Sequence, residues 1–192
     1  MKIFLFLYPI KQYFKSEINN SFLFRKKNHD PKRINSIINA RYREKGYQMA
    51  WLMFSDPNEA LRPDISSVSD YVEILKDDII IVSGVSFEKH LKEKKYPEYV
   101  FILAQMPHTT ELVLGGFHQW DCVDKLAEHA YRSKISTRVD EDTTELFFLS
   151  TVLKGEIPLI RKKFTLKDMG INNQWLIFAK KARRGKPWFL QT

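Results

Sequence analysis

Cysteine is nearly absent from this sequence, because Cys122 is the only one among 192 residues. A single cysteine excludes an internal disulfide framework and a metal cluster held by several cysteines, and it suits a reducing compartment. We therefore expect a cytoplasmic protein. No residue pattern in the chain predicts a bound metal or an organic cofactor, so we expect neither.

Long apolar runs are also missing, and none approaches the roughly 18 residues that a membrane-spanning helix requires. The first run, Ile3 to Leu7, is soon followed by Pro9 and Lys11, and no small-residue cleavage site comes after it. We expect this run to be a buried first strand rather than a signal peptide. The sequence therefore predicts no membrane partner.

Positive charge is in excess, with a net charge of +8, but much of it is concentrated near the C-terminus. Five basic residues lie in the tract KKARRGK, residues 180–186, and without them the net charge is about +3. Such a tract near a chain end is typical of a solvated or tethering segment. We expect one domain over residues 1–192 with a basic tail at about 180–192, and the pattern does not favour a nucleic-acid partner.

Short apolar runs alternate along the chain with segments of helical period. The helical segments are 30–46, 97–106 and 123–131, while 55–70 has the composition of a loop. The apolar runs are 3–7, 47–54, 77–84, 111–116 and 136–142, and 172–180 could be a last strand. Continuously apolar strands that alternate with helices indicate a parallel sheet buried on both faces. The sequence predicts an α/β domain, a three-layer α/β/α sandwich with a mostly parallel sheet of five to six strands.

In such a sheet, ligands bind at the carboxyl ends of the strands. The residues that follow the predicted strands are 8–11, 55–56, 83–84, 116–122 and 140–142. Cys122 is among them, at the expected start of a helix, where free amides and partial positive charge would stabilise a thiolate and lower its pKa. The neighbouring Asp121 could serve as the N-cap and would partly oppose this effect. Cys122 is the candidate nucleophile, and the alternative is a small, buried, inert residue.

Residues 112–145, LVLGGFHQWDCVDKLAEHAYRSKISTRVDEDTTE, resemble the cysteine segment of the isochorismatase-like hydrolases, which include nicotinamidases and N-carbamoyl amide hydrolases. A strand that ends in Gly116, the pair Cys122-Val123 and a strand that closes on Asp142 match the family pattern. Similarity to two earlier units of the family extends the resemblance over roughly residues 1–150. The resemblance implies a cis peptide near His118–Gln119 and self-association into a homo-oligomer.

The same comparison with the family identifies what this sequence lacks. The family's catalytic aspartate would fall on residues 8–10, which are Tyr, Pro and Ile, and its catalytic lysine would fall on Ser83, five residues after Asp78. The metal-binding aspartate of nicotinamidase-type members has a counterpart in Asp56, but no histidine follows it within reach. Of the family's catalytic triad, only the cysteine remains.

Several residues are therefore expected around the former active site. His118 is the candidate substitute base, with a satisfied polar loop residue as the alternative. The three acidic residues 140–142 could bind a cation or form a solvated turn, and we expect His90 and His129 to face solvent. The expected pocket residues are Tyr8, Ser83, Gly116, Gln119 and Trp120.

Two classes of function remain open on the sequence. The first is a divergent member of the family that is catalytically impaired and binds a small molecule or takes part in assembly. The second is a cysteine-dependent hydrolase of a small amide or related compound, in which Cys122 works with a substitute base. The missing aspartate and lysine favour the first class, since a general base typically contributes about 10² to 10⁴-fold to the rate.

Overall fold

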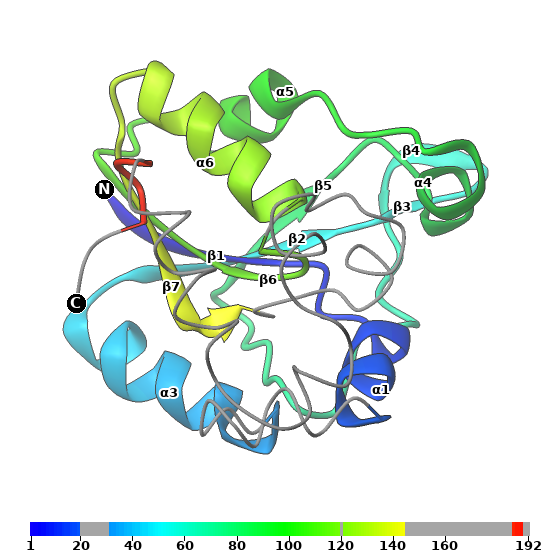
Figure 1. Cartoon of the computed structure of the whole chain (residues 1–192), viewed down its shortest axis with the longest axis horizontal. Coiled ribbons are helices and arrows are strands. Elements are labelled where there is room, and N and C mark those ends of the chain that lie inside the picture. The colour runs from blue at the N-terminus through cyan, green and yellow to red at the C-terminus, as the bar shows by residue number, and fades with distance from the viewer. Residues whose placement is uncertain (20–30, 120, 145–185, 190–192) are drawn as a thin grey trace, which may run out of the picture.

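A computed structural model describes residues 1–19, 31–119, 121–144 and 186–189 of the chain. One sheet of five strands crosses the centre of the molecule in the order β5-β2-β1-β6-β7, and every neighbouring pair is parallel (Figure 1). The strands are β1 Lys2–Leu7, β2 Gln48–Met53, β5 Ile79–Val82, β6 Glu111–Gly116 and β7 Ser136–Thr144. The predicted parallel sheet is thus confirmed, whereas the possible strand at 172–180 lies outside the described residues.

Helices cover both faces of this sheet. In Figure 1, α1 (Lys11–Asn19) and α3 (Ile34–Arg41) lie below it, and α5 (Tyr99–Ala104) and α6 (Cys122–Arg132) lie above it. The helix α4 (Phe87–Glu93) follows β5, and two 3₁₀ helices, Pro31–Arg33 and Arg43–Lys45, flank α3. This arrangement confirms the three-layer α/β/α prediction. Among the described residues, no helix combines the length and the apolar character needed to cross a membrane.

The core is centred on β1, whose residues Ile3 to Leu7 are all fully buried. The ring of Phe6 packs against Trp51 of β2 and against Phe117 after β6, each with its centroid 5.8 Å away. Gly116 ends β6 with a φ of +94°, and a Cβ at this position would lie 2.2 Å from the carbonyl oxygen of Leu7. Because only glycine allows this approach, the backbone of β6 can turn beside the end of β1.

The prediction of a continuous loop over 55–70 is wrong for its first half. Residues 55–63 form an antiparallel hairpin of β3 (Ser55–Asp56) and β4 (Glu59–Pro63). The Asp56 carboxylate accepts a hydrogen bond of 2.8 Å from the amide of Asn58, which stabilises the turn between the strands. The residues of β4 are exposed or half-buried. The sequence therefore has no alternation of apolar and polar residues from which this strand could be predicted.

Four residues of the predicted basic tail, 186–189, pack against α6 and β7. The side chains of Trp188 and Phe189 are buried, and the Trp188 indole N–H donates a 2.8 Å hydrogen bond to Asp124 of α6. The Lys186 ammonium pairs with the same carboxylate. The amide of Val139 in β7 donates to the Trp188 carbonyl at 2.9 Å, so this short segment is held by both backbone and side-chain contacts.

Candidate functional site

Cys122 lies at the carboxyl end of β6, where the chain turns into α6. The peptide bond between Phe117 and His118 is cis, one bond earlier than the sequence prediction. The carbonyl of His118 then accepts hydrogen bonds from the amides of Asp121 (3.0 Å) and Val123 (3.3 Å), which closes the turn that leads into the helix. As predicted from the position of the strand ends, Cys122 is the first residue of α6, and it is only 2 % exposed.

The expectation that the helix N-terminus lowers the pKa of the Cys122 thiol is wrong. Burial raises the pKa well above its ordinary value, and the negative charge of Asp121 raises it further. The nearby Lys125 charge and the hydroxyls of Tyr99 and Tyr8 act in the opposite direction without reversing the shift. The desolvation cost of a buried thiolate therefore exceeds the stabilisation that the helix terminus supplies.

Tyr8 directly follows β1 and is one of the three residues, 8–10, on which the resemblance places the family's aspartate. Its backbone has a φ of +55°, and its ring stacks on Phe54 with the centroids 4.0 Å apart. The hydroxyls of Tyr8 and Tyr99 are buried and have no hydrogen bond of good geometry to any described residue. Both nevertheless lie close enough to Cys122 to interact electrostatically with its sulfur. Aromatic surface thus covers the thiol at a point where a hydrolase needs a base.

Other expected pocket residues support the backbone around the site. The Ser83 hydroxyl donates to the carbonyl of Val85 at 2.8 Å, so it stabilises the turn after β5. The Gln119 side-chain amide donates to the Thr144 hydroxyl at 2.7 Å and links the Cys122 turn to the end of β7. Ser83, Gly116 and Gln119 are all buried, whereas Trp120 lies outside the described residues.

His118, the predicted substitute base, is buried beside aromatic rings. Its ring meets Tyr13 of α1 edge-on at 4.5 Å and lies 5.6 Å from the ring of Phe117. It also lies near enough to His90 to contribute to the lowering of the pKa of that residue. The role of His118 as a base stays a prediction.

His90 was expected to face solvent, and this prediction is wrong. The residue lies on α4 with 9 % exposure, and its ring is 5.5 Å from Phe54 and 6.1 Å from Tyr8. Nδ1 lies 2.9 Å from the carbonyl oxygen of Lys95. Because a carbonyl only accepts, Nδ1 carries the proton in this contact and Nε2 keeps its lone pair. Burial is the main cause that lowers the pKa of His90, which favours the neutral ring.

The position of His90 could have been inferred from helical spacing. His90 follows Phe87 by three residues, and residues at i and i+3 share a helix face. The Phe87 ring packs against Phe54 at 5.3 Å, so this face of α4 points into the molecule. The surrounding lysines and glutamates of EKHLKEK conceal the pattern.

Asp121 precedes α6 at the N-cap position, but its side chain makes no capping hydrogen bond. One carboxylate oxygen pairs with the Lys125 ammonium at 2.7 Å, and the other accepts a 3.0 Å hydrogen bond from the Tyr96 hydroxyl. One donor atom each from His90, Asp121 and Cys122 lie within 4.8 Å of one another. The fold therefore brings His90 of α4 to the adjacent residues Asp121 and Cys122, about thirty residues further along the chain.

The acidic residues 140–142 have a protein partner for their charge. The Arg41 guanidinium pairs with Asp140 at 3.1 Å and with Asp142 at 2.7 Å, and the Tyr42 hydroxyl also donates to Asp140. Neither a cation site nor a freely solvated turn describes these contacts. The chain's own arginine supplies the positive charge and ties α3 to β7.

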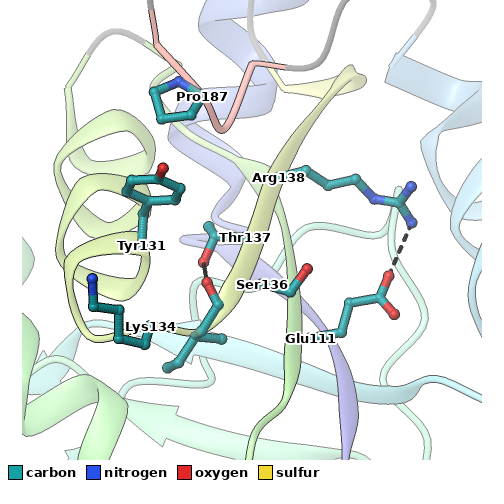
Figure 2. Close-up of a pocket in the computed structure, with 8 residues that line it drawn as sticks. Glu111, Tyr131, Lys134, Ser136, Thr137, Arg138 and Pro187 are labelled. Carbon is teal, nitrogen blue, oxygen red and sulfur yellow. Dashed lines mark hydrogen bonds and ion pairs between the residues drawn. The ribbon is translucent and has the colours of Figure 1, made fainter.

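A second candidate site is a hollow of about 560 Å³ at the opposite end of the sheet, where β7 begins. Figure 2 shows Tyr131 and Lys134 on one side of β7 and Arg138, paired with Glu111 at 3.3 Å, on the other. The volume is within the range of small-molecule sites, about 300–1,000 Å³. Residues that line it are Glu111, Tyr131, Lys134, Ile135, Ser136, Thr137, Arg138 and Pro187.

Comparison with protein families and with curated proteins finds no match to this chain. Comparison with solved structures does find similar folds. A pyrazinamidase of Pyrococcus horikoshii, solved in complex with zinc, is 10% identical with a TM-score of 0.51, and the match covers 94% of each chain. An isochorismatase family protein is 12% identical with a TM-score of 0.50, over 99% of this chain and 98% of that one.

These likenesses span nearly the whole chain, and they agree with the α/β architecture built on a parallel five-stranded sheet. At such low identity they concern the arrangement of the backbone. The two similar structures are named as a pyrazinamidase and as an isochorismatase family protein. The chain has the α/β fold of the isochorismatase-like superfamily.

Proposed function

We propose that this chain has lost the cysteine-dependent hydrolysis of its structural relatives and acts as a small-molecule binding protein. The observation that carries the first part is the cover over Cys122. Cys122 is 2 % exposed, and the hydroxyls of Tyr8 and Tyr99 lie close to its sulfur. A nucleophile must come within about 3–3.5 Å of the carbon that it attacks, and the burial of Cys122 opposes such an approach.

The missing partners of the cysteine support the same conclusion. The resemblance places a carboxylate at one of residues 8–10, which are Tyr, Pro and Ile, and an ammonium at the position of Ser83. Burial raises the pKa of the Tyr8 hydroxyl well above its ordinary value, so the hydroxyl keeps its proton and cannot accept one from the thiol. The Ser83 hydroxyl is committed to the Val85 carbonyl. Without these groups, the chain lacks the acid and base by which the family activates its thiol and protonates a leaving amine.

Alkylation of Cys122 tests the covered thiol. In native protein at neutral pH, with a chelator present, we expect iodoacetamide to modify Cys122 slowly, since both burial and a raised thiol pKa oppose the reaction. The urea-unfolded chain is the control and should be modified rapidly at one site. Mass spectrometry follows both reactions. Rapid, complete modification of the native chain would contradict the proposal.

One observation favours a second candidate function, a hydrolase in which His90 is the substitute base. The lone pair of Nε2 belongs to a neutral ring that lies near Cys122, as a Cys–His pair would require. A panel of small amides and esters separates the two functions. Turnover that both Cys122→Ala and His90→Gln abolish would support the hydrolase, whereas equal background rates for parent and variants would support the loss of activity.

The hollow at the start of β7 supports the binding part of the proposal. The Lys134 ammonium and the exposed ring of Tyr131 lie on the same side of β7 (Figure 2). A cation beside an aromatic ring suits a small organic anion that also carries a flat apolar part. We therefore infer a carboxylate or phosphate of this kind as the ligand class.

Ligand-detected NMR with a panel of aromatic and aliphatic carboxylates and phosphates tests this site. We expect selective binding of aromatic anions, and Lys134→Gln should weaken it about 5- to 10-fold, because one exposed charge contributes roughly 1 kcal/mol. Arg132→Gln is the matched control, since Arg132 is an exposed cation two residues away that pairs with Glu128 at 2.5 Å. Equal loss in both variants would indicate only a general effect of net charge. Binding that Lys134→Gln leaves unchanged would exclude this hollow as the site.

The sequence also predicts a homo-oligomer, and this stays a proposal. The β5 edge of the sheet carries Ile80 with 37 % exposure, and Leu61 and Ile65 in and after the hairpin are 71 % and 64 % exposed. Such apolar side chains would be covered if two copies met at this end of the sheet.

A further inference from the structure

His90, Asp121 and Cys122 bring three kinds of metal ligand to one place. An imidazole nitrogen, a carboxylate oxygen and a thiolate sulfur are the three donors that zinc accepts in proteins. One such atom from each residue lies within 4.8 Å of the other two. Ligands around a tetrahedral zinc ion, at about 2.0–2.3 Å from the metal, are roughly 3.5 Å apart. An inward shift of about 1 Å would therefore bring the three atoms to coordination distance.

We propose that His90, Asp121 and Cys122 bind one divalent transition-metal ion of the zinc type. Nε2 of His90 supplies the nitrogen ligand, because Nδ1 donates its proton to the Lys95 carbonyl. Metal-binding histidines usually make such a contact through their second nitrogen, which fixes the tautomer and the ring orientation. The Tyr96 hydroxyl orients the Asp121 carboxylate in the same way.

The Tyr8 and Tyr99 hydroxyls both face the Cys122 sulfur, which is a poor acceptor as a neutral thiol. Tyr8 is 1 % exposed, and neither its hydroxyl nor that of Tyr99 has a hydrogen bond of good geometry to a described residue. Leaving a buried hydroxyl without a partner costs roughly 1–3 kcal/mol. A thiol sulfur is a weak acceptor, whereas a metal-bound thiolate carries negative charge and accepts more strongly. Metal binding would therefore provide both hydroxyls with an acceptor.

The charges of the complex also balance. As the bond between Sγ and the metal forms, the S–H bond of Cys122 breaks and its proton leaves to solvent. The thiolate and the Asp121 carboxylate then compensate the two positive charges of the ion, while neutral His90 adds none. Asp121 keeps 25 % of its side chain exposed, so an ion can reach the ligands from this edge. Three protein ligands leave the fourth position for water.

Lys125 is the group that opposes binding. Its ammonium lies 2.7 Å from the Asp121 carboxylate and 3.4 Å from the centre of the Tyr96 ring. It therefore competes with the ion for one carboxylate oxygen and repels positive charge. Removal of this ammonium should strengthen metal binding, whereas removal of a ligand should weaken it.

Titration of the full chain with Co²⁺ tests the site after dialysis against a chelator. Cobalt replaces zinc in many sites, and a thiolate ligand gives it a charge-transfer absorption band in the near ultraviolet. We expect this band to saturate at one equivalent of Co²⁺ and to disappear when Zn²⁺ is added. A chain that shows no such band overturns the proposal, and this result requires no variant to fold.

Variants then assign the ligands. Cys122→Ala should abolish the band, and Lys125→Met should strengthen Co²⁺ binding. His90→Gln should weaken Co²⁺ binding by at least about 100-fold, which is more than the 10- to 100-fold typical when a residue that hydrogen-bonds to a metal ligand is replaced. His108→Asn is the control, since His108 is an exposed histidine in a loop with a φ of +64°, which asparagine also tolerates. Circular dichroism confirms that each variant is folded. If folded His90→Gln binds Co²⁺ as tightly as the parent chain, the proposal is wrong.

Discussion

Replacement of Tyr8 by alanine is expected to expose the Cys122 sulfur and to accelerate its alkylation about 100-fold in the presence of a chelator. The Tyr8 ring is buried, stacks on Phe54 at 4.0 Å and lies beside His90 at 6.1 Å. Truncation of a buried aromatic side chain removes about 3–5 kcal/mol of stabilising contacts. If the free energy of the local opening that admits the reagent falls by about 3 kcal/mol, the alkylation rate rises roughly 100-fold.

Two further variants show whether the effect is local. Tyr8→Phe keeps the ring and loses only the hydroxyl, so the alkylation of Cys122 should remain slow. Tyr42→Ala is the matched control, because Tyr42 is also buried and stacked, on Phe4 at 4.3 Å, but near the other end of the sheet. If Tyr42→Ala accelerates the reaction as much as Tyr8→Ala does, the thiol is reached by general unfolding and the Tyr8 ring is not its cover.

The layers of this fold could be predicted because the strands are buried on both faces. After the first residue of each strand, Lys2 or Gln48, β1 and β2 contain no polar residue, and such strands are typical of a parallel sheet covered on both faces. The start of α6 could be located for a similar reason. Gly116 ends the strand before Cys122, and the apolar face of the helix follows Cys122 in the sequence. These features depend on local sequence and on burial alone.

The chemistry of the site could not be predicted in the same way. A cysteine at a helix N-terminus is expected to ionise easily, but the energy of its thiolate depends on what covers it, and the cover comes from β1, α4 and α5. His90 illustrates the same problem, because its helix carries charged neighbours while its own side chain points inward. Long-range packing therefore decides both the pKa of Cys122 and the identity of its neighbours.

Asp78 shows how a residue taken from a family pattern can have a structural role. The sequence comparison used it only to count to Ser83. In the structure its carboxylate is 2 % exposed and accepts hydrogen bonds from both terminal nitrogens of Arg43, at 2.6 and 3.0 Å, and from the Trp51 indole at 2.8 Å. The Leu75 amide donates a further bond at 2.9 Å. Asp78 thus joins β2 to the segment that leads into β5.

Replacement of Asp78 by asparagine is expected to lower the free energy of unfolding by about 3 kcal/mol at pH 7, because it leaves the Arg43 charge without its buried partner. Burial alone would raise the pKa of Asp78, but the hydrogen bonds from Arg43, Leu75 and Trp51 outweigh it and hold the pKa below the ordinary value. The ion pair therefore stabilises the fold fully above about pH 4, where an unfolded aspartate is ionised, and the stabilisation is lost as the pH falls towards the folded-state pKa.

Urea unfolding at several pH values between neutral and acid measures this difference. The gap in stability between the parent chain and Asp78→Asn should be largest at neutral pH and should shrink as the pH falls below about 4, because protonation removes in the parent what the substitution has already removed. Asp77→Asn is the matched control, because Asp77 is the neighbour of Asp78 in the sequence and is exposed. Surface substitutions of this kind usually change stability by less than about 0.5 kcal/mol. If Asp78→Asn and Asp77→Asn unfold at the same urea concentration at pH 7, the Arg43–Asp78 pair does not contribute to the stability of the fold.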